Sequence, residues 1–224
     1  MPIVGYILCA IAAYLLGSIP TGFLVGKARG IDIRAVGSGN IGATNVLRAL
    51  GTPAGVFVLL ADGLKGWLAA APVAGVICAW SYPNAGAHAR EWFHIMGALC
   101  AVLGHNYTCW LRFKGGKGIA TSAGVLAALV PYALLIILAV FLVVLAVSRY
   151  VSLASISASF ALPFATWATR RQTEGSWTLV AVTAAMAVLA IYKHRSNIGR
   201  LLNRTENQLG SGKKITEEAQ KTTR

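Results

Sequence analysis

The sequence predicts an all-α integral membrane protein, a helical bundle of seven transmembrane helices, two of them short, with the N-terminus outside and the C-terminus cytoplasmic. Of its 224 residues, 56% are hydrophobic and only 12% are charged, which is about half the roughly 25% of an ordinary soluble domain. The net charge of +13 lies in short basic patches between apolar spans, as in cytoplasmic loops of membrane proteins. These patches favour phosphate-bearing ligands and membrane lipids as partners, and no nucleic acid.

The first two spans follow from length and charge. Residues 2–26 carry no formal charge and are long enough to cross about 30 Å of hydrocarbon. Basic residues come next, namely Lys27, Arg29, Arg34 and Arg48. The positive-inside rule therefore places the N-terminus outside and this loop inside. The second span runs from near Pro53 to about Trp80, and its Asp62 and Lys65 share one helical face. They form either a structural pair between helices or a support for the loop.

The middle of the chain requires a choice between one crossing and two. An external turn at 81–91 leads into a third span at 92–111. Residues 119–148 are uncharged, with Pro131 near the middle, and they are too long for one crossing without tilt. Two short crossings of about 15 residues, each about 22 Å long, keep the later basic residues inside. We therefore expect two.

Residues 150–169 and 175–192 complete the seven spans. The external loop between them holds Arg170, Arg171 and Glu174. Residues 1–208 are expected to form a single membrane-embedded domain. Residues 209–224 are polar and poor in apolar groups, which predicts a flexible tail.

The loop after the first span has the composition of an anion site. Residues 37–48 contain three glycines that let the backbone approach a ligand, together with neutral donors and an arginine whose planar fork suits oxyanions. These side chains are Ser38, Asn40, Thr44, Asn45 and Arg48, and Gly39 lies among them. The glycines also match a dinucleotide-binding pattern, but an apolar span rather than a strand precedes them. A flexible connector is the alternative.

A second polar segment follows the third span. It begins with Gly104, His105 and Asn106 and continues with Lys114, Gly115, Gly116, Lys117 and Gly118. Glycines around a lysine, opening directly into a helix, offer backbone donors, a helix N-terminus and a positive charge. The segment is not a Walker A loop, because the first glycine and the closing Ser or Thr of that motif are missing. A juxtamembrane basic turn is the alternative.

Two further polar patches are expected at the same face of the membrane. Ser152 either donates to a ligand or caps its helix. His194 and Asn197 fall on one face if the chain there forms a continuous helix, and Glu206 follows. No histidine has an aspartate five residues on, and there is no nucleophile elbow or metalloprotease motif. The four cysteines have no metal spacing, so the motifs indicate anion sites without a general base or metal.

Five motifs together resemble the bacterial acyl-phosphate-dependent glycerol-3-phosphate acyltransferases. They are residues 17–22, 37–46, 113–118 and 149–155, and His194 with Asn197. The resemblance implies transfer of a fatty acyl group from acyl phosphate to the 1-hydroxyl of glycerol 3-phosphate, the first acylation step of phospholipid synthesis. It also implies an inner-membrane enzyme with its active site facing the cytoplasm, without cofactor or metal and without obligatory acyl-CoA or acyl carrier protein.

The resemblance also implies roles for individual residues. Acyl phosphate would be held by Ser38, Gly39, Asn40, Thr44, Asn45, Gly115, Gly116 and Lys117. Glycerol 3-phosphate would be held by Arg48, Lys114, Ser152, His194 and Asn197. The catalytic set would be Ser38, Arg48, Lys114, Lys117, His194 and Asn197. Which loop takes which phosphate stays open.

Two residues depart from the family pattern, and one other class of function competes. Thr108 stands where the family usually has proline, and Arg204 where it has glycine, so the turn after Asn106 and the approach to Glu206 are expected to differ. The competing function is a membrane transporter for organic phosphates, suggested by short, broken spans. A transporter predicts related halves and polar residues reaching the midplane from both sides, whereas the polar patches here crowd one face.

Overall fold

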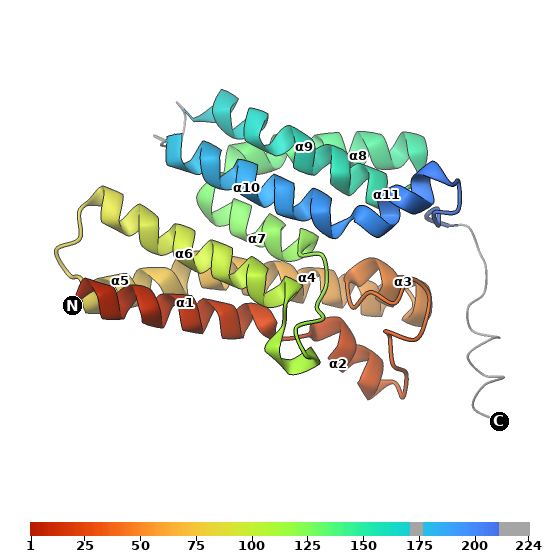
Figure 1. Ribbon diagram of the computed structural model, residues 1–224, viewed down its shortest axis with the longest axis horizontal. Coiled ribbons are helices and arrows are strands. Elements are labelled where there is room, and N and C mark those ends of the chain that lie inside the picture. Colours follow the sequence, from red (N-terminus) through yellow and green to blue (C-terminus); the bar gives the residue numbers. More distant parts are fainter. Residues whose placement is uncertain (171–176, 211–224) are drawn as a thin grey trace. The chain divides into compact units, whose positions relative to one another are not determined.

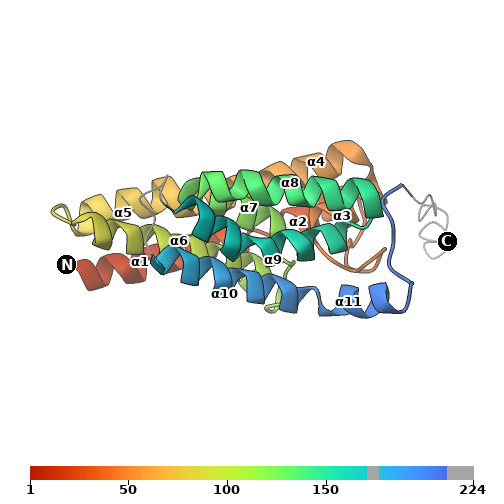
Figure 2. The same ribbon diagram turned by 90° about the horizontal axis from the view of Figure 1, so that it is seen from above.

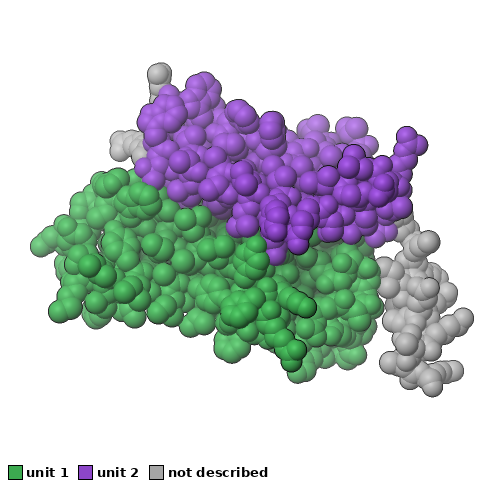
Figure 3. Space-filling model, viewed as in Figure 1, with its two compact units in different colours: residues 1–128, 213–224 green, residues 129–212 purple. Residues whose placement is uncertain are grey.

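The computed structural model describes residues 1–170 and 177–210 and divides the chain into two compact units, coloured separately in Figure 3. Unit 1 contains residues 1–128 and unit 2 begins at Leu129. The described residues form helices joined by loops, without a strand among them (Figures 1 and 2). The all-α prediction is therefore confirmed. Arg171, Glu174 and the predicted tail from residue 211 onward lie outside the described residues.

Unit 1 carries the helices of the first half of the chain. They are α1 (Pro2–Ser18), α2 (Thr21–Ala28), α3 (Ala43–Leu50), α4 (Thr52–Leu68), the π-helical turn η1 (Ala69–Val73), α5 (Ala74–Ser81), α6 (Ala87–Asn106), the 3-10 turn η2 (Cys109–Leu111) and α7 (Ile119–Leu129). Unit 2 carries α8 (Pro131–Ser148), α9 (Val151–Thr169), α10 (Trp177–Lys193) and α11 (Arg195–Leu202).

Close packing of α1 on α6 fixes the frame of unit 1. Four small buried residues recur at every fourth position of α1, namely Gly5, Cys9, Ala13 and Gly17. A methyl group at Gly17 would overlap the Ala101 carbonyl of α6, and one at Gly104 would overlap the Tyr14 carbonyl of α1. Small residues in register let membrane helices approach backbone to backbone. The end of α6, which carries His105, is thereby held against the end of α1.

Two apolar spans of unit 1 are interrupted. Pro20 has no N–H group, and the chain breaks at Ile19–Pro20 between α1 and α2. Pro72 lies in the π-helical turn between α4 and α5, where the Ala70 carbonyl accepts a hydrogen bond from His94 Nδ1 (2.7 Å). Irregular backbone inside a membrane must find such partners within the protein.

Among the described residues, four helical segments are long and apolar enough to span a membrane, and a fifth qualifies if the bent pair α10 and α11 counts as one. The four are residues 2–28, 52–81, 131–148 and 151–169. The chain is thus an all-helical, multi-pass integral membrane protein, as predicted.

Several predicted boundaries are wrong. Residues 119–148 do break into two helices, but the break falls at Val130, so α7 has 11 residues and α8 has 18. Only α7 is short, because Pro131 occupies the first turn of α8, where its fixed φ is favourable. The predicted third span lies on α6, which begins at Ala87 rather than near residue 92. Residues 87–91, which were expected in an external turn, therefore belong to this helix.

Unit 2 buries hydroxyl groups within one helix. The buried hydroxyls of Ser155, Ser159 and Thr166 on α9 each donate to a carbonyl four residues earlier. They are satisfied inside their own helix, so α9 keeps a narrow buried face of serine, threonine and alanine. α10 and α11 meet at an angle of 56° next to His194. His194 is the residue between the two helices, so the condition of one continuous helix through His194 and Asn197 is not met.

Candidate active site

Asn45 organises the first glycine loop, residues 37–42. Its side chain is 2% exposed. Its Nδ2 donates to three carbonyl oxygens at 2.9–3.1 Å, those of Ile33, Val36 and Asn40. Its Oδ1 accepts from the Ser38 N–H group (2.9 Å). Asn45 therefore shapes the loop from inside, while Ser38 and Gly39 are exposed on it.

The loop path needs left-handed backbone at two positions. Gly37 and Gly39 have φ values of 60° and 67°, which side chains with a Cβ adopt only at a cost. Asn40 Oδ1 accepts from the Gly42 N–H (2.8 Å) and closes the last turn before α3. Thr44 and Arg48 lie on α3 and are half-buried.

An ion pair fastens the approach to this loop. Arg34 donates to both carboxylate oxygens of Asp32 (2.9 and 2.6 Å), and its guanidinium lies 4.8 Å from the ring centre of Phe23 on α2. Hydrogen bonds from the Arg34 side chain and backbone lower the pKa of Asp32 to about 2. The pair is therefore charged throughout the physiological pH range.

The second glycine loop, residues 114–118, lies against the end of α6. The N–H groups of Gly115 and Gly116 donate to the Asn106 and His105 carbonyls (3.3 and 3.0 Å). A methyl group at Gly115 would overlap the His105 carbonyl, and one at Gly116 would overlap the His105 ring. These two glycines therefore allow backbone contact with α6, and their N–H groups are engaged within the protein. This differs from the expected use of their N–H groups as ligand donors.

The second loop leads directly into α7. Gly118 has φ 77°, and its carbonyl accepts from the Ser122 N–H (2.7 Å). Lys117 is half-buried and Lys114 is exposed. The loop therefore places a lysine at the N-terminus of α7, where helix N–H groups and the dipole favour an anion.

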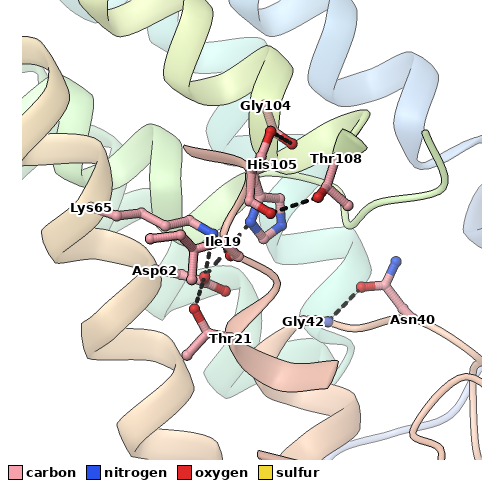
Figure 4. A network of polar contacts seen from close by, with 10 residues as sticks. Ile19, Thr21, Asn40, Gly42, Asp62, Lys65, Gly104, His105 and Thr108 are labelled. Atoms are coloured by element: carbon pink, nitrogen blue, oxygen red, sulfur yellow. Dashed lines mark hydrogen bonds and ion pairs between the residues drawn. The ribbon is translucent and has the colours of Figure 1, made fainter. Parts of the chain in front are cut away.

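A buried charged cluster lies where α1, α4 and α6 meet (Figure 4). Asp62 Oδ1 lies 2.7 Å from Lys65 Nζ, 3.0 Å from Thr21 Oγ1 and 3.7 Å from His105 Nδ1. We call these four residues the Asp62 cluster. Lys65 also donates to the Ile19 carbonyl (2.7 Å). The cluster thus joins the two interrupted spans to the end of α6.

Thr108 secures the other side of the α1–α2 break. Its hydroxyl donates to the Ser18 carbonyl (2.6 Å) and is fully buried. The departure from the family's proline thus supplies a hydroxyl group that satisfies a carbonyl next to the break.

In unit 2, Glu206 joins two of the three remaining predicted ligands, Ser152 and Asn197. Its Oε1 accepts from Ser152 Oγ (2.9 Å) and Asn197 Nδ2 (2.7 Å), and its Oε2 accepts from Arg200 Nε (2.7 Å). The alternative that Ser152 only caps α9 is wrong, because its hydroxyl bonds Glu206 and no side-chain cap bond is present at that end. His194 Nδ1 lies 2.8 Å from the Ala190 carbonyl.

The structure therefore groups the predicted site residues within each unit. Unit 1 holds Ser38, Gly39, Asn40, Thr44, Asn45 and Arg48 around the first loop, and Lys114, Gly115, Gly116 and Lys117 in the second. Unit 2 holds Ser152, His194 and Asn197. The sequence did not indicate the central position of Glu206 or the hydrogen bonds of Thr21 and Thr108. A carboxylate close behind a basic patch was the available signal for Glu206, and the proline break was the signal for Thr21.

Glu206 predicts a specific response to acid. Burial raises its pKa, but hydrogen bonds from Asn197, Arg200 and Ser152 outweigh this and hold the pKa below its ordinary value of 4.5. A lowered folded-state pKa stabilises the protein above the ordinary value, and this stabilisation is lost as pH falls through the folded-state value. We expect the melting temperature in detergent to decrease as the pH is lowered below the ordinary carboxyl pKa. The decrease should be smaller in Glu206→Gln. An equal fall in both proteins would contradict the prediction.

These features define a multi-pass helical membrane protein with glycine loops and lysines suited to phosphate-bearing ligands. A family model described as glycerol-3-phosphate acyltransferase matches residues 7–204. The glycerol-3-phosphate acyltransferase of Geotalea daltonii is 47% identical over 201 residues, which cover 90% of this chain and 96% of the relative. The enzyme of the same description from Geobacter sulfurreducens is 47% identical over 196 residues, 88% of this chain and 93% of the relative.

A solved structure agrees with these matches. The crystal structure of PlsY, an integral membrane glycerol 3-phosphate acyltransferase, in its glycerol 3-phosphate form has a TM-score of 0.79 and 39% identity. The match covers 92% of this chain and 96% of that one. A second structure of PlsY, in its lysophosphatidic acid form, gives a TM-score of 0.77 and 38% identity. The chain belongs to the glycerol-3-phosphate acyltransferase family, as the resemblance indicated.

Proposed function

We propose that this chain transfers a fatty acyl group from acyl phosphate to the 1-hydroxyl of glycerol 3-phosphate, giving lysophosphatidic acid and inorganic phosphate. The observation that carries the proposal is the family match over residues 7–204, which spans both glycine loops and the helix after His194. The related PlsY structures with glycerol 3-phosphate and lysophosphatidic acid support the acceptor and product. The acyl phosphate donor is supported by the two separate phosphate-type loops.

The proposed reaction needs no side chain as general base. The 1-hydroxyl oxygen attacks the acyl carbonyl carbon, the bond from that carbon to the phosphate oxygen breaks, and the hydroxyl proton passes to the departing phosphate. Acyl phosphate is already activated, so the protein supplies orientation and charge stabilisation. Lys117, held next to the N-terminus of α7, is suited to the charge that develops on the phosphate.

Contacts within each unit support a more specific proposal for the individual residues. Ser38, Gly39, Asn40 and Thr44 with Lys117 are proposed to contact acyl phosphate, while Asn45, Gly115 and Gly116 shape the loops from behind. Arg48, Lys114, Ser152, His194 and Asn197 are proposed to bind glycerol 3-phosphate. The bonds from Ser152 and Asn197 to Glu206 support a fixed orientation for these two side chains.

The proposed topology has seven spans in the bacterial inner membrane, with the N-terminus outside and the C-terminus and active site facing the cytoplasm. Basic residues follow the ends of α2, α6 and α10, namely Arg29, Arg112, Lys114 and Arg195. The positive-inside rule assigns these ends to the cytoplasm. We further propose that residues 1–208 act as one membrane-embedded domain.

A transporter for organic phosphates is the second candidate. The breaks in the α1–α2 and α4–α5 spans favour it, since transporter sites use interrupted helices. It predicts that glycerol 3-phosphate binds without being consumed.

Lys117→Ala is expected to lower turnover. A hydrogen bond to a charged group contributes about 1.5–3 kcal/mol, which corresponds to about a 10- to 100-fold loss. Purified protein in lipid would receive palmitoyl phosphate and glycerol 3-phosphate, and phosphate and lysophosphatidic acid would be measured. Lys27→Ala, which removes an exposed lysine outside both glycine loops, is the matched control.

The outcomes separate the candidates. Lysophosphatidic acid from palmitoyl phosphate but not from palmitoyl-CoA, with loss in Lys117→Ala alone, supports the acyltransferase and its donor. Phosphate release without the lipid product indicates a hydrolase. Binding of glycerol 3-phosphate without any turnover favours the transporter.

A further inference from the structure

We propose that Asp62 is a positioning residue that couples the two glycine loops, so that one buried carboxylate holds both phosphate sites in working order. The inference rests on the proposed function. Asp62 and Lys65 are 1% and 4% exposed, and both lie on a membrane span. Charged groups at such depth are costly and are commonly functional. The contacts of Asp62 lead to each loop by a separate route.

The first route runs through Thr21 to the first loop. The Thr21 hydroxyl donates to Asp62 at the N-terminus of α2. The next residue, Gly22, packs so closely on the first loop that a methyl group there would overlap the Ile41 carbonyl and come within 3.0 Å of Val46 Cγ2. Ile41 belongs to the loop and Val46 to α3. The position of α2 therefore sets the position of the first loop.

The second route runs through His105 to the second loop. Asp62 faces Nδ1 of the His105 ring, and the opposite ring nitrogen, Nε2, faces Gly116 so closely that no methyl group fits between them. The His105 carbonyl also accepts from the Gly116 N–H (3.0 Å). Ring and backbone of one residue thus fix the chain immediately before Lys117. A rotation of the ring would displace that lysine.

Lys65 makes the arrangement electrostatically consistent. From α4, the Lys65 ammonium group reaches the C-terminal end of α1, where it donates to the Ile19 carbonyl. The Asp62 carboxylate reaches the N-terminal end of α2, where it accepts from Thr21. A helix carries partial negative charge at its C-terminus and partial positive charge at its N-terminus. The ion pair therefore matches both ends of the broken span. If Asp62 and Lys65 served only to neutralise each other's charge, they would not also contact the α1–α2 break and His105.

The coupling is tested by hydrogen exchange on the full-length protein in lipid, which needs no turnover. Thr21→Val removes the first route and is expected to speed amide exchange in residues 37–42 alone. His105→Phe removes the second and is expected to speed exchange in residues 114–118 alone. Asp62→Asn is expected to affect both loops. Thr21→Ser keeps the hydroxyl group and is expected to match the wild type.

The outcomes decide the matter even if one variant fails to fold. Asp62→Asn leaves Lys65 without its counter-charge, whereas Thr21→Val and His105→Phe keep the ion pair and carry the test alone if needed. Unchanged exchange in both loops would overturn the proposal. An equal rise throughout unit 1 would also overturn it, because it would show a merely structural pair.

Kinetics separate this inference from the proposed function. With wild-type turnover established, Asp62→Asn is expected to lower kcat/KM for both substrates by about 10- to 100-fold, the loss typical of residues that orient a site from behind. Thr21→Ser should restore what Thr21→Val loses. Wild-type turnover with an unaltered Asp62→Asn enzyme refutes the coupling alone. The predicted exchange pattern without wild-type turnover refutes the function alone.

Discussion

Asn45→Asp is expected to abolish turnover while changing the size of the side chain hardly at all. The amide donates to three carbonyl oxygens in a buried site, whereas a carboxylate would place negative charge against all three. An uncompensated buried charge costs about 3–5 kcal/mol, which corresponds to a loss of about a hundred- to a thousandfold or more. We expect the first glycine loop to open, because opening costs less free energy than burying the unpaired carboxylate.

The measurement is lysophosphatidic acid formation together with amide exchange in residues 37–42. Asn84→Asp is the matched control, because it adds the same charge at an exposed position of the turn between α5 and α6. An Asn45→Asp enzyme with near-normal turnover would show that the loop is not organised by this amide.

Gly116→Ala is expected to lower the turnover rate about a hundredfold although it adds only one methyl group. That methyl group would overlap the His105 ring, so either the ring or the second glycine loop must move. Overpacking costs about 1–3 kcal/mol, and a displacement of about 1 Å in a reacting group costs about a hundredfold in rate. Both Lys117 and the Asp62 cluster would be displaced together.

Gly75→Ala serves as its control. A methyl group there would make ordinary contact with His94 at 3.8 Å, and alanine is favoured over glycine inside a helix such as α5. Gly75→Ala is expected to keep its activity and melting temperature. Equal losses in the two variants would mean that any glycine substitution in unit 1 is damaging, and that displacement of the His105 ring is not the cause.

The lengths of the apolar stretches and the positions of the charged residues were sufficient to predict the helical membrane fold. Both depend only on the thickness and polarity of the bilayer, which are similar for all membrane proteins. The positions of the later basic residues predicted two helices within residues 119–148. They did not predict that these helices differ in length, which follows because Pro131 occupies the favourable first turn of α8. The start of α6 was missed because Arg90 and Glu91 suggested a solvent loop. In the structure Arg90 Nε instead donates to the Ala85 carbonyl just before the helix (2.9 Å).

The site was predicted by residue type but not by direction. The composition of the first loop showed that Ser38, Asn40 and Asn45 could donate hydrogen bonds, yet only tertiary structure shows that Asn45 turns inward. The glycines of the second loop suggested backbone donors for a ligand, whereas Gly115 and Gly116 instead donate to carbonyls at the end of α6. Contacts such as Thr21 to Asp62 join residues 41 positions apart, and no local pattern encodes them.

The Asp62 cluster also bears on how the protein is made. Its members come from the first, second and third apolar stretches of the chain. The Ile19 carbonyl, which accepts from Lys65, and the Thr21 hydroxyl, which donates to Asp62, are both synthesised before these two charged residues. A single charged residue in the middle of a membrane helix costs roughly 2.5–3.5 kcal/mol on insertion. The second stretch therefore enters the bilayer with its acceptor and donor already in place. A circularly permuted chain that makes the first stretch last would have to insert this ion pair before the Ile19 carbonyl and the Thr21 hydroxyl exist.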